Sequence, residues 1–176
     1  MKDDENKIKN LSHDDAIKKM KELAEKENIC MFVTKLSDIP LNGRPMATQQ
    51  VDDKGNFWFF SASTSDKNRD IVSDERVQLF YANKGSSEYL SVYGKAEIVY
   101  DMAKNEELWN PMVKAWFKEG KDDPELTLIK VTPEDAYYWD TKNNKLVSLL
   151  KIVGSVVSGK TLDDSVEGKL SQPKKF

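Results

Sequence analysis

The chain has 176 residues, a formal net charge of −3 and a pI near 5.4. This length favours one domain with a buried core, and the acidic balance argues against a general nucleic-acid-binding protein. Residues 1–10 are charged and lack the apolar stretch of a secretion signal, and no segment approaches the roughly 20 apolar residues of a membrane span. We therefore expect a soluble, cytoplasmic protein without a nucleic-acid or membrane partner.

The chain divides into three parts by composition. We expect residues 1–10 to be a disordered N-terminal segment, residues 11–158 to form a single domain, and residues 159–176 to form a polar tail. The one cysteine, Cys30, lies in the apolar run NICMFVTKL, so an internal disulfide is excluded and a buried thiol is expected. A reducing compartment suits this cysteine usage.

Residues 11–28 carry apolar side chains at helical spacing and predict an N-terminal amphipathic helix. Ser12 is placed to cap it, and Asp14 and Asp15 would lie in its first turn, where carboxylates suit the helix dipole. The only histidine, His13, lies at the start of this helix. Without a second ligand nearby, it is expected to be a surface residue, and no metal site is predicted.

From residue 28 onward the sequence changes to short runs rich in β-branched and aromatic residues, separated by turn residues. In YLSVYGKAEIVY, Leu90, Val92, Ala96 and Ile98 would lie on one face of a strand. This pattern predicts antiparallel strands in a mainly β barrel or sandwich with flanking helices. The predicted strands are NICMFVTKL, RPMATQQVD, NFWFFSA, VQLFYAN, YLSVYGKAEIVY and LTLIKVTPEDAYYWD.

Three further helices are expected between and after these strands. The first covers residues 65–73, with Ser65 or Asp66 near its cap. The second covers residues 103–119, where Pro111 predicts a kink or a break into two pieces. The third is a C-terminal helix over residues 143–158, which carries leucines and valines on one stripe.

The usual catalytic motifs are missing from the sequence, which has one histidine and one cysteine. A histidine-based triad or a transition-metal site is therefore improbable, and an enzymatic reaction would depend on a cofactor. Two features could bind an anion: Arg44 after the turn LNGRP, and the stretch FSASTSDKNRDI with Ser61, Ser63, Ser65 and Lys67 near a helix start. From the residues alone, this stretch is either a solvated turn with a helix cap or a phosphate cradle.

Five segments in order resemble one known family: GRPMATQ, FWFFSA with STSDKNRDI, SVYGKAE, LWNPMVKAWFKEGKDDPEL and PEDAYYWD. They are similar to the FMN-binding split barrels related to pyridoxamine 5′-phosphate oxidase, in particular the general stress protein 26-like branch. The resemblance covers roughly residues 14–169. It implies a six-stranded antiparallel barrel and a homodimer that holds FMN at the subunit interface, with FAD as the alternative cofactor.

The resemblance also implies which residues contact the flavin. Arg44 and Lys67 would hold its phosphate with hydroxyls of Ser61 and Ser65, and the backbone after Arg44 would lie along the ring. Tyr89 and Trp139 fall where the oxidases use residues of the partner chain. The full set of expected cofactor-binding residues is Arg44, Pro45, Met46, Ala47, Thr48, Phe60, Ser61, Ser65, Asp66, Lys67, Tyr89 and Trp139.

Two departures from the oxidases bear on the substrate. Gln49 stands where they carry a lysine for the substrate phosphate, and DTKNNKL follows Trp139 without the histidine of their R-x-H segment. We therefore expect an FMN-binding stress protein, a flavin-dependent oxidoreductase with an unknown substrate. The alternatives are a pyridoxamine 5′-phosphate oxidase, a relative that binds FAD or a deazaflavin, and a β-barrel binding module without a redox role.

Overall fold

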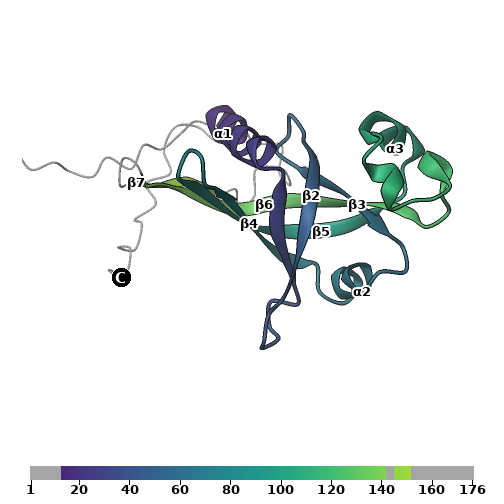
Figure 1. Ribbon diagram of the computed structural model, residues 1–176. Coiled ribbons are helices and arrows are strands. Elements are labelled where there is room, and N and C mark those ends of the chain that lie inside the picture. Colours follow the sequence, from purple (N-terminus) through teal and green to yellow (C-terminus); the bar gives the residue numbers. More distant parts are fainter. Residues whose placement is uncertain (1–12, 142–144, 152–176) are drawn as a thin grey trace, which may run out of the picture.

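The computed structural model describes residues 13–141 and 145–151 (Figure 1). Within these ranges the predicted strands are present, and three α-helices accompany them. The elements are α1 (His13–Lys26), β1 (Ile29–Thr34), β2 (Asn42–Val51), β3 (Phe57–Ala62), α2 (Asp66–Ser73), β4 (Arg76–Asn83), β5 (Glu88–Val99), α3 (Met102–Leu108), the 3₁₀ turns η1 (Val113–Ala115) and η2 (Gly120–Asp122), β6 (Leu126–Asp140) and β7 (Lys145–Lys151).

The strands form a closed antiparallel barrel. Their order is β3-β2-β1-β4-β5-β6, and a pairing between β3 and β6 closes the ring of six. Every pairing between neighbours is antiparallel. This arrangement confirms the predicted mainly β fold and its six-stranded barrel. No helix among the described residues is long and apolar enough to cross a membrane.

Strand β6 is long enough to pair with two different strands along the same edge. Residues 126–131 pair with β3, and residues 135–140 pair with β7, which extends the sheet beyond the barrel. The helix predicted over residues 143–158 is therefore wrong for Lys145–Lys151, while residues 152–158 lie outside the described part. The apolar run LVSLL is too short for its period to separate helix from strand, and the otherwise unpaired edge of β6 decides the outcome.

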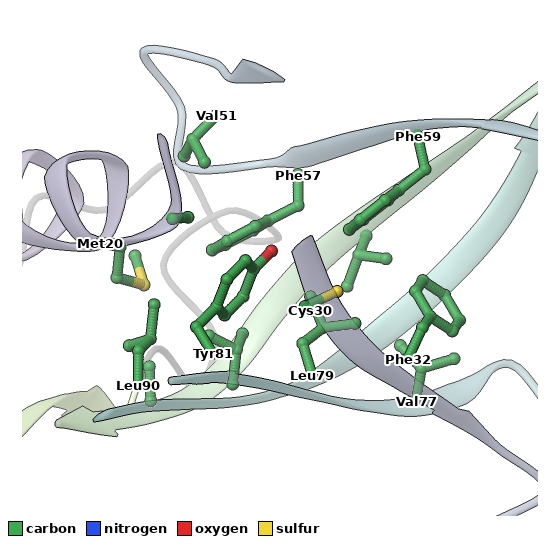
Figure 2. Packing of buried hydrophobic residues seen from close by; sticks show 14 of the residues in the cluster. Met20, Cys30, Phe32, Val51, Phe57, Phe59, Val77, Leu79, Tyr81 and Leu90 are labelled. Atoms are coloured by element: carbon green, nitrogen blue, oxygen red, sulfur yellow. The ribbon is translucent and has the colours of Figure 1, made fainter. Parts of the chain in front are cut away.

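The barrel interior is filled by large aromatic and aliphatic side chains (Figure 2). Phe59 of β3 meets Phe32 of β1 edge to face at 5.2 Å between ring centroids, and Phe57 lies 6.1 Å from Tyr81 of β4. Helix α1 adds Met20 to the same cluster. Burial of this apolar area supplies the main stabilisation of the fold.

Cys30 lies within this core at 1% exposure, as predicted. Burial raises the pKa of its thiol to about 12, although hydrogen bonding with Tyr81 and Thr48 partly offsets the effect. The thiol is therefore protonated at neutral pH and chemically unreactive in the folded protein.

Gly94 marks a close approach between β5 and β6. The pairing register shifts between Tyr93 and Gly94, and a Cβ at Gly94 would lie 2.3 Å from the carbonyl oxygen of Thr132. No side chain fits at that distance from a backbone atom, so glycine is required for this bulge.

Residues 101–125, termed the insertion below, cover the outer face of β3. Helix α3 ends at Leu108, and Pro111 follows before the two 3₁₀ turns, which confirms the predicted break in this segment. The insertion packs Trp109 and Phe117 against Phe60 of β3. Figure 1 shows α3 at one end of the molecule and β7 at the other.

Candidate functional site

The start of α2 is built on the end of β3. Ser65 caps the helix, and its hydroxyl accepts a hydrogen bond from the backbone N–H of Asn68. Ser61 is only 2% exposed, and its hydroxyl donates to Oδ1 of Asn68 over 2.5 Å. Ser61 therefore supports the first turn of the helix from inside the protein, whereas Ser65 lies at its half-exposed end.

A second buried residue completes this support. Asn68 donates from Nδ2 to Oγ1 of Thr127 over 3.0 Å, and the Thr127 hydroxyl donates to the carbonyl oxygen of Ser61 over 2.9 Å. These hydrogen bonds tie α2 to both β3 and β6. A buried polar network whose members are satisfied in this way fixes the position of the helix N-terminus.

Arg44 reaches α2 from the neighbouring strand β2. It stands opposite Phe32 of β1, and its side chain is 21% exposed. Nη1 donates to Oγ1 of Thr34 over 2.8 Å, and Nη2 lies 3.4 Å from Oδ2 of Asp70 in α2. Arg44 is therefore held by one residue from β1 and one from α2.

Asp70 is the carboxylate at the centre of this group, with a side chain only 7% exposed. It accepts a hydrogen bond from Thr34 over 2.6 Å and forms a salt bridge with Lys35 at 3.2 Å. Burial alone would raise the pKa of Asp70. The hydrogen bonds from Thr34 and Lys35 and the charges of Lys35 and Arg44 outweigh it and hold the pKa below its ordinary value.

Lys67 brings a second cation to the first turn of α2. Its pKa is lowered mainly by burial and next by the positive charge of Arg44, with Asp66 acting in the opposite direction. In the part of the chain that the structure describes, no carboxylate forms a salt bridge with Lys67, and Asp66 is paired with Arg69. Arg44 of β2 therefore lies near enough to Lys67, in the first turn of α2, for its charge to act on Lys67.

This donor set suits a phosphate monoester. Arg44 offers a planar fork, Lys67 a compact charge, Ser65 a hydroxyl, and the first turn of α2 its backbone N–H groups. Burial and then the charge of Arg44 lower the pKa of Lys67, and a dianion placed between the two cations would offset their repulsion. Among the described residues no group of acidic, histidine or cysteine side chains is arranged to hold a metal ion.

The residues that follow Arg44 alternate between the two faces of β2, as a strand requires. Pro45 is exposed and Ala47 is half-buried, so both lie toward the outside of the barrel. Met46 packs against the core, and Thr48 is buried with its hydroxyl 2.6 Å from that of Tyr81. The side chains of Met46 and Thr48 therefore point into the barrel, on the same face of β2 as Arg44, whose guanidinium reaches α2.

The other expected contact residue on β3, Phe60, lies under the insertion. Its ring lies 6.1 Å from that of Trp109 and 6.5 Å from that of Phe117. The insertion also reaches β2, where Asn110 donates from Nδ2 to Oε1 of Gln49 over 2.9 Å. The amide of Gln49 donates to the Ala47 carbonyl, so both ends of its side chain are engaged.

Tyr89 and Trp139 form a separate group. They are paired across β5 and β6, and Trp139 meets Tyr137 at 4.8 Å. Ser61 pairs with Thr127 of β6, and the length of chain from there to Trp139 along this strand is roughly 40 Å at about 3.3 Å per residue. One chain therefore does not bring Trp139 to Arg44 and Lys67, and Figure 1 shows α2 well away from the end where β6 meets β7.

The sequence analysis missed the residues that hold Arg44 and the helix start, namely Thr34, Lys35, Asn68 and Asp70. Asp70 follows Lys67 at a helical spacing of three, which is the one local signal for it. Nothing in the sequence indicates its contact with Thr34, because the two residues belong to different elements and meet only in the folded barrel.

Two curated relatives resemble this chain. Protein bli-3 of Neurospora crassa is 30% identical over 129 residues, which are 68% of this chain and 62% of that protein. General stress protein 26 of Bacillus subtilis is 34% identical over 61 residues, which are 35% of this chain and 43% of that protein. The chain thus spans less than two thirds of the length of either relative.

Solved structures share the fold. A Clostridium acetobutylicum protein related to general stress protein 26 has a TM-score of 0.65 at 23% identity, with 79% of this chain and 96% of that chain covered. The general stress FMN/FAD binding protein of Xanthomonas citri has a TM-score of 0.62 at 24% identity, with 89% and 97% covered.

A family model gives the assignment at the level of sequence. The model described as pyridoxamine 5′-phosphate oxidase like matches residues 15–163, which is most of the chain. Together with the split barrel and the homologues named general stress protein 26, this match shows that the chain belongs to the pyridoxamine 5′-phosphate oxidase-like family.

Proposed function

We propose that the protein is an FMN-binding stress protein, a homodimeric flavin-dependent oxidoreductase whose substrate is still to be found. The observation that carries this proposal is that Arg44, which contacts Asp70 of α2 at 3.4 Å, lies near enough to Lys67 in the first turn of that helix for its charge to act on Lys67. The FMN phosphate would lie between these two cations. The half-exposed Ser65 hydroxyl would become a further donor by turning away from Oδ1 of Asn68, to which it donates over 3.2 Å. Ser61 would support the cap rather than touch the phosphate, because its hydroxyl is already bonded to Asn68.

The charge of the cradle supports a dianionic ligand. Lys35, Arg44 and Lys67 bring three positive charges, and Asp70 brings one negative charge. The surplus of two matches a phosphate monoester, which carries about −1.5 to −2 near neutral pH. A neutral or singly charged ligand would leave part of this surplus uncompensated.

The outer face of β2 is the surface along which the ring would lie. Pro45 and Ala47 face outward there, and β3 pairs with β2 only from Thr48 onward, which leaves the preceding backbone edge available to the polar edge of the ring. The Xanthomonas citri neighbour, which is described as an FMN/FAD binding protein, supports a flavin over other phosphate compounds. Bound FMN would supply hydride or electron transfer, and the residues of this chain would bind and orient it.

A second copy of the chain would complete the site. Tyr89 and Trp139 are too far along β5 and β6 to reach the cradle of their own chain. The outer barrel face near them exposes Ile29, Met31 and Phe80, of which Met31 and Phe80 are paired across β1 and β4. An apolar face of this kind is typical of subunit interfaces, so the partner's Tyr89 and Trp139 would cover the flavin. The cytoplasm is proposed as its location, since the buried free thiol of Cys30 suits a reducing compartment.

The contacts of Gln49 bear on the oxidase alternative. Its side chain is neutral and is tied to Asn110 of the insertion, so it offers no cation to a substrate phosphate. We therefore propose a substrate other than pyridoxamine 5′-phosphate. Release of hydrogen peroxide from that compound by FMN-loaded protein tests this point, and robust turnover would reverse it.

Titration with FMN, with the quenching of tryptophan fluorescence as the readout, tests the proposal directly. Arg44→Ala and Lys67→Ala should each weaken binding by roughly 1.5–3 kcal/mol, the usual contribution of a hydrogen bond to a charged group. Lys54→Ala is the matched control, because Lys54 is exposed in the β2–β3 turn. FMN, FAD and riboflavin should be compared in the same assay.

Each outcome of these titrations bears on a different part of the proposal. Wild-type protein that fails to bind FMN at tens of micromolar would refute the function. Binding that Arg44→Ala and Lys67→Ala leave unchanged would refute the phosphate cradle alone. Tighter binding of FAD than of FMN would change the proposed cofactor to FAD and leave the proposed phosphate cradle in place.

A further inference from the structure

Thr34 is a buried residue whose hydroxyl makes two specific hydrogen bonds, which core packing alone would not require. It is the last residue of β1 and is 0% exposed. Its Oγ1 accepts a hydrogen bond from Nη1 of Arg44 over 2.8 Å and donates one to Oδ2 of Asp70 over 2.6 Å. The hydroxyl therefore links the arginine to the carboxylate, with its donor and its acceptor capacity both in use.

These contacts restrict how the guanidinium of Arg44 can turn. Arginine has five N–H donors in one plane, so two anchored nitrogens fix the orientation of that plane. Among the described residues, Thr34 accepts a hydrogen bond from Nη1 and Asp70 accepts one from Nη2. The remaining donors are left for a ligand, and Lys67 is near enough for the charge of Arg44 to affect it.

We propose that Thr34 and Asp70 are positioning residues for the phosphate cradle, which hold Arg44 in the orientation that an anion requires. This inference rests on the proposed function, since it concerns the FMN phosphate. Neither residue touches the ligand itself. Pre-orientation of this kind raises affinity because the arginine loses little further freedom on binding.

The two residues differ in what a substitution would reveal. Asp70 both orients Arg44 and repels a phosphate through its charge, so its removal would change two opposing effects together. Thr34 is uncharged, and its removal changes orientation without changing the charge of the cradle. Thr34 is therefore the residue that isolates positioning.

The test compares Thr34→Val and Thr34→Ser by titration with FMN and with riboflavin, which lacks the phosphate. Valine has nearly the volume of threonine but can neither accept from Arg44 nor donate to Asp70. We expect Thr34→Val to weaken FMN binding by about ten-fold and to leave riboflavin binding within about two-fold of wild type. Thr34→Ser restores the hydroxyl and should bind FMN nearly as wild type does.

A double-mutant cycle shows whether the effect passes through Arg44. In the Arg44→Ala background, Thr34→Val should have little further effect on FMN affinity, because no guanidinium remains to be positioned. A residue that merely stabilised the fold would lower riboflavin and FMN binding alike, and its effect would persist without Arg44. If Thr34→Val does not fold, Thr34→Ala removes the same hydroxyl without adding bulk and decides the question.

The outcomes separate this inference from the proposed function. If wild-type protein does not bind FMN, the proposed function is wrong and this inference with it. If Arg44→Ala weakens FMN binding and Thr34→Val does not, the cradle stands and positioning by Thr34 is refuted. Equal loss of FMN and riboflavin binding in Thr34→Val would also refute it.

Discussion

Tyr89 of β5 stands directly opposite Trp139 of β6, at the end of the strand pair that lies beyond the closed barrel. The proposed phosphate cradle, formed by Arg44 and Lys67 at α2, lies near the end where β3 pairs with the first residues of β6, so the same strand connects two distant groups. If both groups belong to one flavin site, two chains must build it. This geometry gives the proposed dimer a direct test.

Arg44→Ala and Trp139→Ala should each weaken FMN binding as separate homodimers. When the two variants are denatured, mixed and refolded together, a heterodimer should contain one site with both residues intact. Random assembly would restore about a quarter of the sites to wild-type affinity in a two-fold symmetric dimer. The measurement is an FMN titration with the fraction of tight sites as the readout.

Mixing Arg44→Ala with Lys67→Ala is the matched control, because one chain would contribute both residues to a given site. No tight sites should appear in that mixture. A monomeric protein, or recovery in the control mixture, would contradict the shared site.

The lowered pKa of Lys67 predicts a loss of FMN affinity at alkaline pH. Burial and the charge of Arg44 place this pKa below 10.5 in the free protein, and a bound phosphate would raise it again. As pH rises through the lowered value, Lys67 loses its charge and the ratio of FMN to riboflavin affinity should fall. Because riboflavin carries the same ring, the ratio removes effects of ring ionisation.

Lys67→Arg should extend the plateau of this ratio to higher pH, since arginine stays charged. Lys67→Ala should show a lower ratio without the alkaline fall. A wild-type ratio that stays constant to about pH 10.5 would show that Lys67 does not contact the phosphate.

Gly94→Ala should destabilise the barrel by about 1–3 kcal/mol, because the added methyl group would overlap the Thr132 carbonyl. The measurement is unfolding in denaturant followed by circular dichroism. Gly85→Ala is the control, since a Cβ there would lie 3.5 Å from Oδ1 of Asn83, an ordinary contact. Equal stability of the two variants would show that β5 and β6 can separate at the bulge without cost.

The barrel was predictable because its strands differ sharply from the helices in period and composition. Alternation in β5 places Leu90 and Val92 in the core, and Pro111 marks the break in the insertion correctly. The failure at Lys145–Lys151 has a different cause. Its apolar residues fit a helical stripe as well as a strand, and the available edge of β6, a tertiary feature, selects the strand.

The phosphate cradle was predictable only in part. Arg44, Ser65 and Lys67 are visible from turn and cap signals together with the family resemblance. Thr34 and Asp70, which hold Arg44, were missed. Thr34 carries no local signal and Asp70 only its helical spacing from Lys67, because their contact forms when β1 meets α2. For Ser61 the sequence predicts a hydroxyl that contacts the phosphate, whereas in the fold this hydroxyl is turned inward and donates to Asn68.

The burial of the one cysteine has a practical consequence for spectroscopy on this protein. Because the Cys30 thiol is enclosed in the core and protonated, a maleimide probe would not react with it in the native state. A cysteine introduced at an exposed position such as Trp116 of the insertion would then be the single labelling site. The natural sequence is thus already a background for fluorescence or spin-label measurements of how the insertion moves when a ligand binds.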